Sequence, residues 1–424
     1  MTPQPPRTVD APMPHACGTP RAALALHGAA RTDVERELAA MSEADRRSLN
    51  GVKFGRRFFG GEGPFEVASS AYGLFAQSNR SSLYPGQPGI SSIGRMHQDL
   101  VDHALDLLNA PPGGAGVVTS GGTESVILAL KAAVTRAKSR GLAVHEMQVV
   151  AAQSAHPCID KAAELLNVCL KRVPTGRNLT ADVAAMAAEL SPATVLIYAS
   201  FPSYPYGLVD DISALGALAD SRGVWLHVDA CMSGLLAPFA RLNGEAIPDF
   251  DFSVPGVASV SADLHKHGYS AKGASLVLFR SAELARLASF SYANHPLPPM
   301  NTPTLAGTAP GAPIASAWAV MKYLGVAGYR DLAARLFASR KAIVAAIESV
   351  PGFAVIGQPL FSVVVVTSEL HDLEKVRAEL SRRRWFTLPV LQPSGIHLNV
   401  GPFDQPLALE LAQDLRAAVE TLRE

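Results

Sequence analysis

Two lysines and two histidines lie between apolar runs in SADLHKHGYSAKG, and Lys266 among them is the side chain whose position needs an explanation. The runs VASVSA before it and ASLVLF after it are typical of buried strands. An unpaired ammonium between them would cost on the order of several kcal/mol unless it is paired, neutralised or used covalently. Lys266 is therefore a candidate for covalent chemistry, for which we expect burial to supply a neutral amine.

Three further motifs place chemically useful residues at the ends of apolar runs. VVTSGGTES puts Gly121 and Gly122 between a strand and a helix, where the amides of Gly122 and Thr123 could hold a phosphate, assisted by the hydroxyl of Thr123 or Ser120. HVDAC ends a strand with Asp229, and QSAHPC puts His156 after another strand. Each motif taken alone also has a simpler interpretation: an ordinary strand–helix turn, a capped structural aspartate and a loop histidine.

The order of these residues along the chain favours one ligand. The glycine turn, the histidine, the aspartate and the lysine each fall at the carboxyl end of an expected parallel strand, where open α/β sheets bind ligands. Pyridoxal 5'-phosphate (PLP) needs a cradle for its phosphate, a flat partner for its ring, a carboxylate for its pyridinium nitrogen and a lysine for its aldehyde. The sequence therefore predicts a PLP site, and no spacing in it predicts a metal site.

The elements that must position these residues alternate over residues 90–280. Helical periodicity is present in SSIGRMHQDLVDHALDLLNA and TESVILALKAAVTRAKSRG, and strand-like runs in ATVLIYAS and VWLHVDAC. Strands separated by helices indicate an α/β fold with a mostly parallel sheet flanked by helices. We expect residues 1–60 to be a tail and a helical segment, 61–300 a large PLP-binding domain, and 301–424 a linker helix and a small C-terminal α+β domain.

Composition excludes several classes of protein. Of the 424 residues 48% are hydrophobic, and 37 basic side chains balance 37 acidic ones, so the basic stripe of a nucleic-acid-binding protein is not expected. No apolar run reaches the roughly 18 to 20 residues that span a bilayer, so no integral membrane segment is expected. The four cysteines lack CxxC spacing, which predicts neither zinc nor a disulfide framework and favours a cytoplasmic location.

Together the motifs resemble the sphingosine-1-phosphate lyase family, a branch of the fold-type I, group II decarboxylase-like PLP enzymes. The resemblance rests on TSGGTES, QSAH, FPSYPYG, HVDAC and SADLHKHGYSAKGAS and extends from about residue 50 to about residue 405. It implies that Lys266 binds the cofactor aldehyde, that Asp229 pairs with the pyridinium nitrogen and that His156 stacks on the ring. It also implies a homodimer with shared active sites, and further cofactor contacts from His265, Gly121, Gly122, Thr123 and Ser200, with Gly307 and Thr308 reaching the neighbouring subunit's site.

The substrate side departs from the family pattern. The resemblance assigns this side to Lys272, Asn79, Arg80, Ser82 and Phe58. Phe58 stands where the family has a tyrosine, Ser82 where it has a histidine and Ala309 where it has an arginine. Each lost charge-assisted bond to a phosphate removes about 1.5–3 kcal/mol, so we expect sphingosine 1-phosphate to be a poor substrate unless Arg80 compensates.

The resulting hypothesis is a PLP-dependent carbon–carbon lyase of the sphingosine-1-phosphate lyase type. It would perform a retro-aldol cleavage of a 2-amino-3-hydroxy compound, phosphorylated or not, to an aldehyde and an amine. A PLP-dependent amino-acid decarboxylase is the alternative, because the same electron sink serves a substrate whose α-carboxylate is held perpendicular to the ring. A non-catalytic sensor of PLP or a lipid phosphate is disfavoured, because it has no use for Lys266, Asp229 and His156 together.

Overall fold

The computed structural model describes residues 26–80, 91–296 and 298–422, and the chain divides into two units, Met1–Gly51 and Val52–Glu424. In the described part of the first unit, α1 (Arg31–Leu49) is a charged helix. An ion pair between Arg31 and Glu35, with Nε and Oε1 2.7 Å apart, joins two side chains one turn apart. Such pairs support a helix without burying apolar surface.

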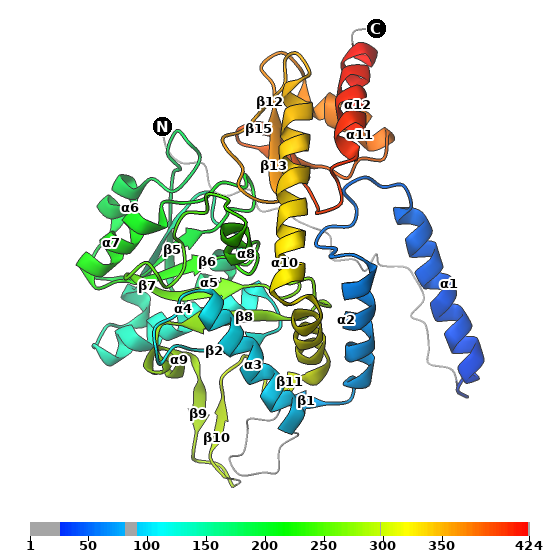
Figure 1. Cartoon of the computed structure of the whole chain (residues 1–424). Helices are drawn as coiled ribbons and strands as arrows, with labels where there is room; N and C mark the ends of the chain where they lie inside the picture. Colours follow the sequence, from blue (N-terminus) through cyan, green and yellow to red (C-terminus); the bar gives the residue numbers. More distant parts are fainter. Residues whose placement is uncertain (1–25, 81–90, 297, 423–424) are drawn as a thin grey trace. The chain divides into compact units, whose positions relative to one another are not determined.

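A seven-stranded sheet forms the centre of the second unit (Figure 1). Its spatial order is β2-β8-β7-β6-β5-β3-β4, and β4, β3, β5, β6 and β7 run parallel while β8 is antiparallel to both β7 and β2. The prediction of a mostly parallel sheet is confirmed. The strands are β2 (Ala115–Thr119), β3 (Gln148–Ala152), β4 (Cys169–Val173), β5 (Thr194–Ser200), β6 (Trp225–Asp229), β7 (Val257–Ala262) and β8 (Ser275–Phe279).

Helices cover both faces of this sheet and create two separate cores. The residues of β5 divide between them, since Ile197 and Ala199 belong to one core and Leu196 and Tyr198 to the other, as the two-residue period of a strand requires. The first core includes residues of α2 (Glu62–Leu74), α3 (Ser91–Leu107), α6 (Val183–Glu189), α7 (Ile212–Arg222), α8 (Ala237–Leu242) and α10 (Gly311–Glu348). The second includes residues of α4 (Gly122–Ser139), α5 (Cys158–Leu166) and α9 (Ala282–Ala288).

The C-terminal part is a smaller α+β domain, as predicted. An antiparallel sheet of order β12-β13-β15-β14 packs with two helices around a third core, to which α10 contributes Ile343 and Ile347. The long helix α10 bends at Gly325, whose φ of 52° is in the left-handed region. The elements are β12 (Ala354–Val355), β13 (Val363–Thr367), α11 (Leu373–Arg382), β14 (Leu388–Leu391), β15 (Ser394–Asn399) and α12 (Leu407–Thr421).

The proline- and glycine-rich segment between α9 and α10 contains strands that its local sequence does not indicate. Strand β9 (Phe290–Tyr292) pairs with β10 (Met300–Thr302), and β11 (Ala309–Pro310) pairs with β1 (Asn79–Arg80), both antiparallel. The second pairing places Arg80 directly across from Ala309, so a guanidinium lies on the strand beside the position where the family carries one.

The carboxyl ends of six of the seven strands meet at one edge of the large sheet. Because β2 is antiparallel to β8 and β8 to β7, β2 runs in the same direction as β7, β6, β5, β3 and β4. The loops that follow these strands therefore emerge on the same side. That edge carries the glycine turn after β2, His156 after β3, Asp229 at the end of β6 and Lys266 after β7.

Candidate active site

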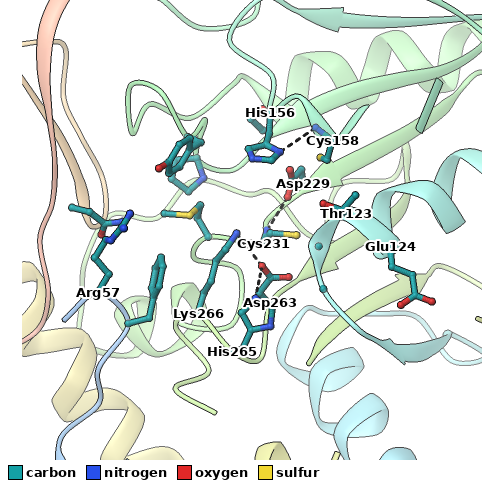
Figure 2. Close-up of a pocket in the computed structure, with 18 of the residues that line it drawn as sticks. Arg57, Thr123, Glu124, His156, Cys158, Asp229, Cys231, Asp263, His265 and Lys266 are labelled. Carbon is teal, nitrogen blue, oxygen red and sulfur yellow. Dashed lines mark hydrogen bonds and ion pairs between the residues drawn. The ribbon is translucent and has the colours of Figure 1, made fainter. Parts of the chain in front are cut away.

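A cavity of about 540 Å³ lies at this edge of the sheet, a size typical of small-molecule sites (Figure 2). It brings together most of the residues that the sequence predicted. Those that line it are Phe58, Gly121, Gly122, Thr123, His156, Ser200, Asp229, His265 and Lys266. Ser82 lies outside the described residues.

The other predicted residues do not line this cavity. Asn79 and Arg80 form β1, and Gly307 and Thr308 lie just before β11, with which β1 pairs. Lys272 is exposed, and its Nζ donates a hydrogen bond of 3.0 Å to the carbonyl of His265. The five residues therefore remain predictions for the substrate side and for a second subunit.

Lys266 is held by an ion pair that the sequence analysis missed. Its Nζ lies 2.9 Å from Oδ2 of Asp263, and 26% of the lysine side chain is exposed against 2% of the aspartate. Burial alone lowers the pKa of Lys266, but the carboxylates of Asp263 and Asp229 outweigh burial and raise that pKa above its usual value. The expectation that burial supplies a neutral amine is therefore wrong, because a paired carboxylate sets the charge of Lys266.

Asp229 is an ionised carboxylate inside a polar cage. Burial opposes its charge, but Lys266 and hydrogen bonds from the Tyr198 hydroxyl and the Cys231 backbone N–H lower its pKa. The Cys231 N–H donates over 3.0 Å and the Ser261 hydroxyl over 3.3 Å, both to Oδ1, while Tyr198 donates to Oδ2. A buried carboxylate that keeps its charge can pair with a protonated ring nitrogen.

The turn between β2 and α4 forms a cradle whose close packing at Gly122 favours glycine. Helix α4 begins at Gly122, so the first N–H groups of an 18-residue helix have no intrahelical acceptor and mark its positive end. A Cβ at Gly122 would lie 2.6 Å from Sγ of Cys231 and 3.1 Å from Oδ1 of Asp263. At Gly121 the nearest atom to such a Cβ would be the His265 ring at 3.7 Å, so the turn stays open on that side.

Glu124 holds this turn in place through hydrogen bonds. Its Oε2 accepts hydrogen bonds from the Ser120 N–H at 2.7 Å and the Ser120 hydroxyl at 2.6 Å, and its Oε1 accepts from the Leu305 N–H at 2.9 Å. The Ser120 hydroxyl is therefore engaged within the chain and does not assist as a free donor. The same carboxylate connects the turn to the segment that precedes β11.

Both histidines of the site are neutral aromatic groups. Burial lowers the pKa of His156 and of His265. Nδ1 of His156 accepts from the Cys158 N–H at 3.1 Å, and Nδ1 of His265 accepts from the Ala274 N–H at 3.2 Å. The His156 ring packs edge-on against Tyr204, with centroids 5.9 Å apart, which fixes its orientation. Because Nδ1 is the acceptor in both rings, the single proton of each neutral imidazole lies on Nε2.

Phe58 forms the apolar wall opposite the cofactor-side residues. Its ring contacts His267 edge-on at a centroid distance of 5.2 Å, and Nζ of Lys272 lies 5.3 Å from the ring centre. Its φ of 59° is in the left-handed region, which a non-glycine residue adopts only where the surroundings hold it. Because phenylalanine replaces the family's tyrosine at this position, the Lys272 ammonium lies near an aromatic ring that has no hydroxyl group.

Sequence reasoning missed four groups of this site. Asp263 could have been found, because a carboxylate three residues before a half-buried lysine is a natural partner, and Tyr198 alternates correctly along β5 to reach Asp229. Arg57 and Asn399 also line the cavity, but they come from segments without any motif. Only the folded chain brings these two side chains to the site.

These residues fit PLP. Gly121 and Gly122 leave room for a phosphate at a helix N-terminus, Asp229 is an ionised acceptor, His156 is a neutral flat ring, and Lys266 faces the same space (Figure 2). When bound, PLP supplies an electron sink for a carbanion formed at the substrate's amine-bearing carbon. The fold and the site thus define a PLP-dependent lyase of the α/β class.

Comparison with known proteins agrees with this class. The pyridoxal-dependent decarboxylase conserved domain matches residues 92–367. The sphingosine-1-phosphate lyase of Oryza sativa subsp. japonica is 35% identical over 85% of this chain and 67% of its own length. A probable L-tyrosine/L-aspartate decarboxylase of Methanocella arvoryzae is 31% identical over 80% of this chain and 86% of its own. The structure of a Burkholderia pseudomallei sphingosine-1-phosphate lyase has a TM-score of 0.87 at 31% identity, covering 94% of this chain and 92% of that one.

The chain belongs to the pyridoxal-dependent decarboxylase family, in its sphingosine-1-phosphate lyase branch. The predicted family, fold, cofactor and class of enzyme are confirmed, and so is a lyase of the sphingosine-1-phosphate lyase type. Within the described ranges of the chain, no helix has both the length and the apolar character needed to cross a membrane. The individual roles of the site residues stay predictions.

Proposed function

We propose that this chain uses PLP to cleave the Cα–Cβ bond of a 2-amino-3-hydroxy compound by a retro-aldol reaction, releasing an aldehyde and an amine. The observation that carries the proposal is the placement of Lys266, Asp263 and Asp229 around one cavity, with the Lys266 amine 2.9 Å from Asp263. Relatives described as sphingosine-1-phosphate lyases support the reaction type.

The proton that leaves the substrate's β-hydroxyl needs a base, and the geometry favours Lys266. The Nδ1 atoms of His156 and His265 already accept from the backbone N–H groups of Cys158 and Ala274, and Nε2 of each ring carries its proton, so neither ring has a free acceptor for a further proton. As the free amine that is released when the substrate's own amine takes its place, Lys266 can accept this proton, and its carboxylate partner Asp263 then stabilises the protonated form. We therefore assign proton movement to Nζ of Lys266, and ring orientation to His156.

We assign the remaining cofactor contacts as the sequence implied. Asp229 holds the pyridinium nitrogen, and His265, Ser200, Thr123 and the amides at Gly121 and Gly122 surround the phosphate side. The turn supports this assignment, since it is open at Gly121, and at Gly122 a Cβ would lie 2.6 Å from Sγ of Cys231.

We further propose a homodimer with shared active sites. Gly307 and Thr308 do not line the cavity of their own chain, but Glu124 of the phosphate turn accepts a hydrogen bond from Leu305 in the same segment. That segment and the β1–β11 pair are therefore tied to the site's edge, from which they can reach a neighbouring copy. The domain boundaries expected from the sequence, at residues 60/61 and 300/301, also remain part of what we propose.

We propose a cytoplasmic location as well. Cys158, Cys169 and Cys231 are free thiols in the described part of the chain, which is typical of a reducing compartment. Subcellular fractionation of the organism with an antibody to the protein tests this location, and recovery in a membrane pellet would contradict it.

Amino-acid decarboxylation is the second candidate function. It is supported by the 31% identity to the Methanocella arvoryzae protein described as a probable decarboxylase. A panel of 2-amino-3-hydroxy compounds and amino acids, scored in parallel for aldehyde and for carbon dioxide, separates the two reactions. We expect aldehyde from the hydroxy compounds and none from a Lys266→Ala variant, whereas carbon dioxide without aldehyde would replace the first proposal by the second.

Mixing two inactive chains tests the shared site. Lys266→Ala chains and Thr308→Val chains should each be inactive, and their mixture should regain up to about a quarter of the activity, because a hybrid dimer has one intact site. Light scattering that finds an active monomer at assay concentration, or a mixture that stays inactive although hybrids form, contradicts the proposal.

A further inference from the structure

The wall of the active-site cavity nearest the C-terminal domain carries two polar groups that the cofactor assignment leaves unused. Arg57 and Asn399 both line the cavity that Lys266 faces. The Asn399 side chain is buried, with 5% of the residue exposed, and its Nδ2 has no hydrogen-bond partner among the described residues. A buried amide donor without a partner costs free energy, so its retention against a cavity points to a ligand.

Arg57 is positioned for the same ligand. Its guanidinium stacks over the Phe386 ring at 4.5 Å, and in the described part of the chain it forms no ion pair with a carboxylate. Figure 2 shows Arg57 on the side of the cavity away from Thr123 and Glu124 of the glycine turn. A cation that faces a cavity without a counter-charge is suited to an anion brought by the substrate.

The backbone around Arg57 is fixed to the C-terminal domain. The Lys53 N–H donates to the Arg384 carbonyl at 2.9 Å, and the Phe386 N–H donates to the Lys53 carbonyl at 3.0 Å. Phe54 is buried against Trp385 with ring centroids 5.0 Å apart. Because this segment is bonded on both sides of Trp385 and the guanidinium stacks on Phe386, Arg57 is positioned before any ligand binds, which lowers the entropy lost on binding.

We propose that Arg57 and Asn399 bind the carboxylate of an amino-acid substrate, so that the compound cleaved is a 2-amino-3-hydroxy acid. This inference rests on the proposed function and names its substrate class. A guanidinium presents a planar fork that matches the two oxygens of a carboxylate, and the Asn399 amide adds one further donor. A phosphate carries more charge and one more oxygen, and the family's polar groups for it are replaced at Phe58 and Ala309.

The reaction balances without a further reactant. The Cα–Cβ bond breaks, the β-hydroxyl loses its proton to Lys266 and becomes the carbonyl of an aldehyde, and Cα gains a proton. The amine product from a 2-amino-3-hydroxy acid is glycine. The corresponding products from an amino alcohol and from its phosphate would be ethanolamine and phosphoethanolamine.

These three products are the probes for the test, since each is the amine fragment that remains after the Cα–Cβ bond of its parent compound has broken. Glycine, ethanolamine and phosphoethanolamine are titrated into the holoenzyme by calorimetry, with the cofactor's absorbance followed in parallel. We expect glycine to bind about ten- to a hundredfold more tightly than ethanolamine. We expect Arg57→Leu and Asn399→Ala to remove most of this preference and to leave ethanolamine affinity within about twofold.

Arg56→Leu is the matched control. Arg56 is exposed, bonds Glu62 at 3.1 Å and lies over Phe59, and it does not line the cavity, so its loss should not change glycine binding. Equal affinity for glycine and ethanolamine in the wild type overturns the inference. So does an Arg57→Leu variant that loses phosphoethanolamine but keeps glycine, which would make this a phosphate site, or one that loses all three probes equally, which would make Arg57 a structural residue.

A separate measurement keeps this inference distinct from the proposed function. Wild-type enzyme is incubated with phenylserine, and benzaldehyde is assayed. Absence of benzaldehyde and of any other aldehyde from the hydroxy-compound panel, with the glycine preference and its loss in Arg57→Leu intact, refutes the retro-aldol proposal and leaves the carboxylate site standing. Aldehyde release without a glycine preference refutes the carboxylate site alone.

Discussion

Restoring one hydroxyl at Phe58 should restore part of the selectivity for phosphorylated substrates. Phe58→Tyr adds an oxygen to a ring that lines the cavity and lies 5.3 Å from Nζ of Lys272. The new hydroxyl would then add a donor beside the lysine for a phosphate. Tyrosine keeps the ring, so the edge-on contact with His267 and the backbone φ of 59° are unchanged.

The size of the effect follows from the kind of bond gained. A hydrogen bond to a charged group is worth about 1.5–3 kcal/mol, which corresponds to about ten- to a hundredfold in affinity. The cost is small, because Phe58 is half-buried at a cavity wall and the hydroxyl can remain hydrated when no substrate is present. We therefore expect the free energy of unfolding to change by less than about 0.5 kcal/mol.

The assay compares kcat/KM for sphingosine 1-phosphate with that for sphingosine, by release of the long-chain aldehyde. The ratio should rise about ten- to a hundredfold in Phe58→Tyr. Phe59→Tyr is the control, since Phe59 packs against Phe403 and does not line the cavity. An unchanged ratio in Phe58→Tyr would refute the reasoning, as would a wild-type kcat/KM for sphingosine 1-phosphate above roughly 10⁴ M⁻¹s⁻¹, the usual enzymatic range.

Three other predictions concern the cofactor side and stability. Borohydride reduction of the yellow holoenzyme should fix the pyridoxyl group on Lys266, as peptide mapping would reveal; a label on Lys272 would contradict the site. Asp229→Asn should keep the cofactor but lower kcat by about a hundredfold or more, because the neutral amide cannot hold the ring nitrogen protonated; unchanged kcat at full cofactor content would contradict this. Burial lowers the pKa of His97 to about 3, and its Nε2 accepts from the Val118 N–H at 3.1 Å, so the unfolded chain takes up a proton below about pH 6.5 that the folded chain refuses. Urea unfolding should therefore show stability falling as pH drops from about 6.5 towards 4, less steeply in His97→Gln, and equal slopes in the two proteins would contradict the assignment.

The cofactor half of the site was predictable because its residues sit in order at strand ends. Parallel strands that alternate with helices must place their carboxyl ends at one edge, so identifying the apolar runs was enough to bring His156, Asp229 and Lys266 together. The glycine turn followed from the same logic, and the tight approach to Cys231 favours glycine at Gly122. Local sequence carried this information because each motif is contiguous with the strand that positions it.

Charge states were not predictable in the same way. The sequence indicated a buried lysine and hence a neutral amine, whereas the pKa of Lys266 rises because Asp263 lies 2.9 Å away. Desolvation and pairing shift the pKa of a lysine in opposite directions, and only a distance decides which effect is larger. The β1–β11 pair was hidden for a similar reason, since a two-residue strand has too few residues to show a period.

Similarity to the family predicts the substrate half of the site least well. Arg57 and Asn399 come from opposite ends of the chain and meet because the segment at Lys53 hydrogen-bonds beside Phe386 while β15 pairs with β13. Neither residue belongs to a motif that positions PLP, so either can change without loss of the cofactor. A fold that holds one cofactor can therefore change substrates through the residues its motifs leave free, and specificity must be argued from such side chains one at a time. In this chain they are an arginine without a carboxylate partner and a buried amide nitrogen without a hydrogen-bond acceptor, both judged among the described residues, and both favour an anion at the C-terminal wall of the cavity.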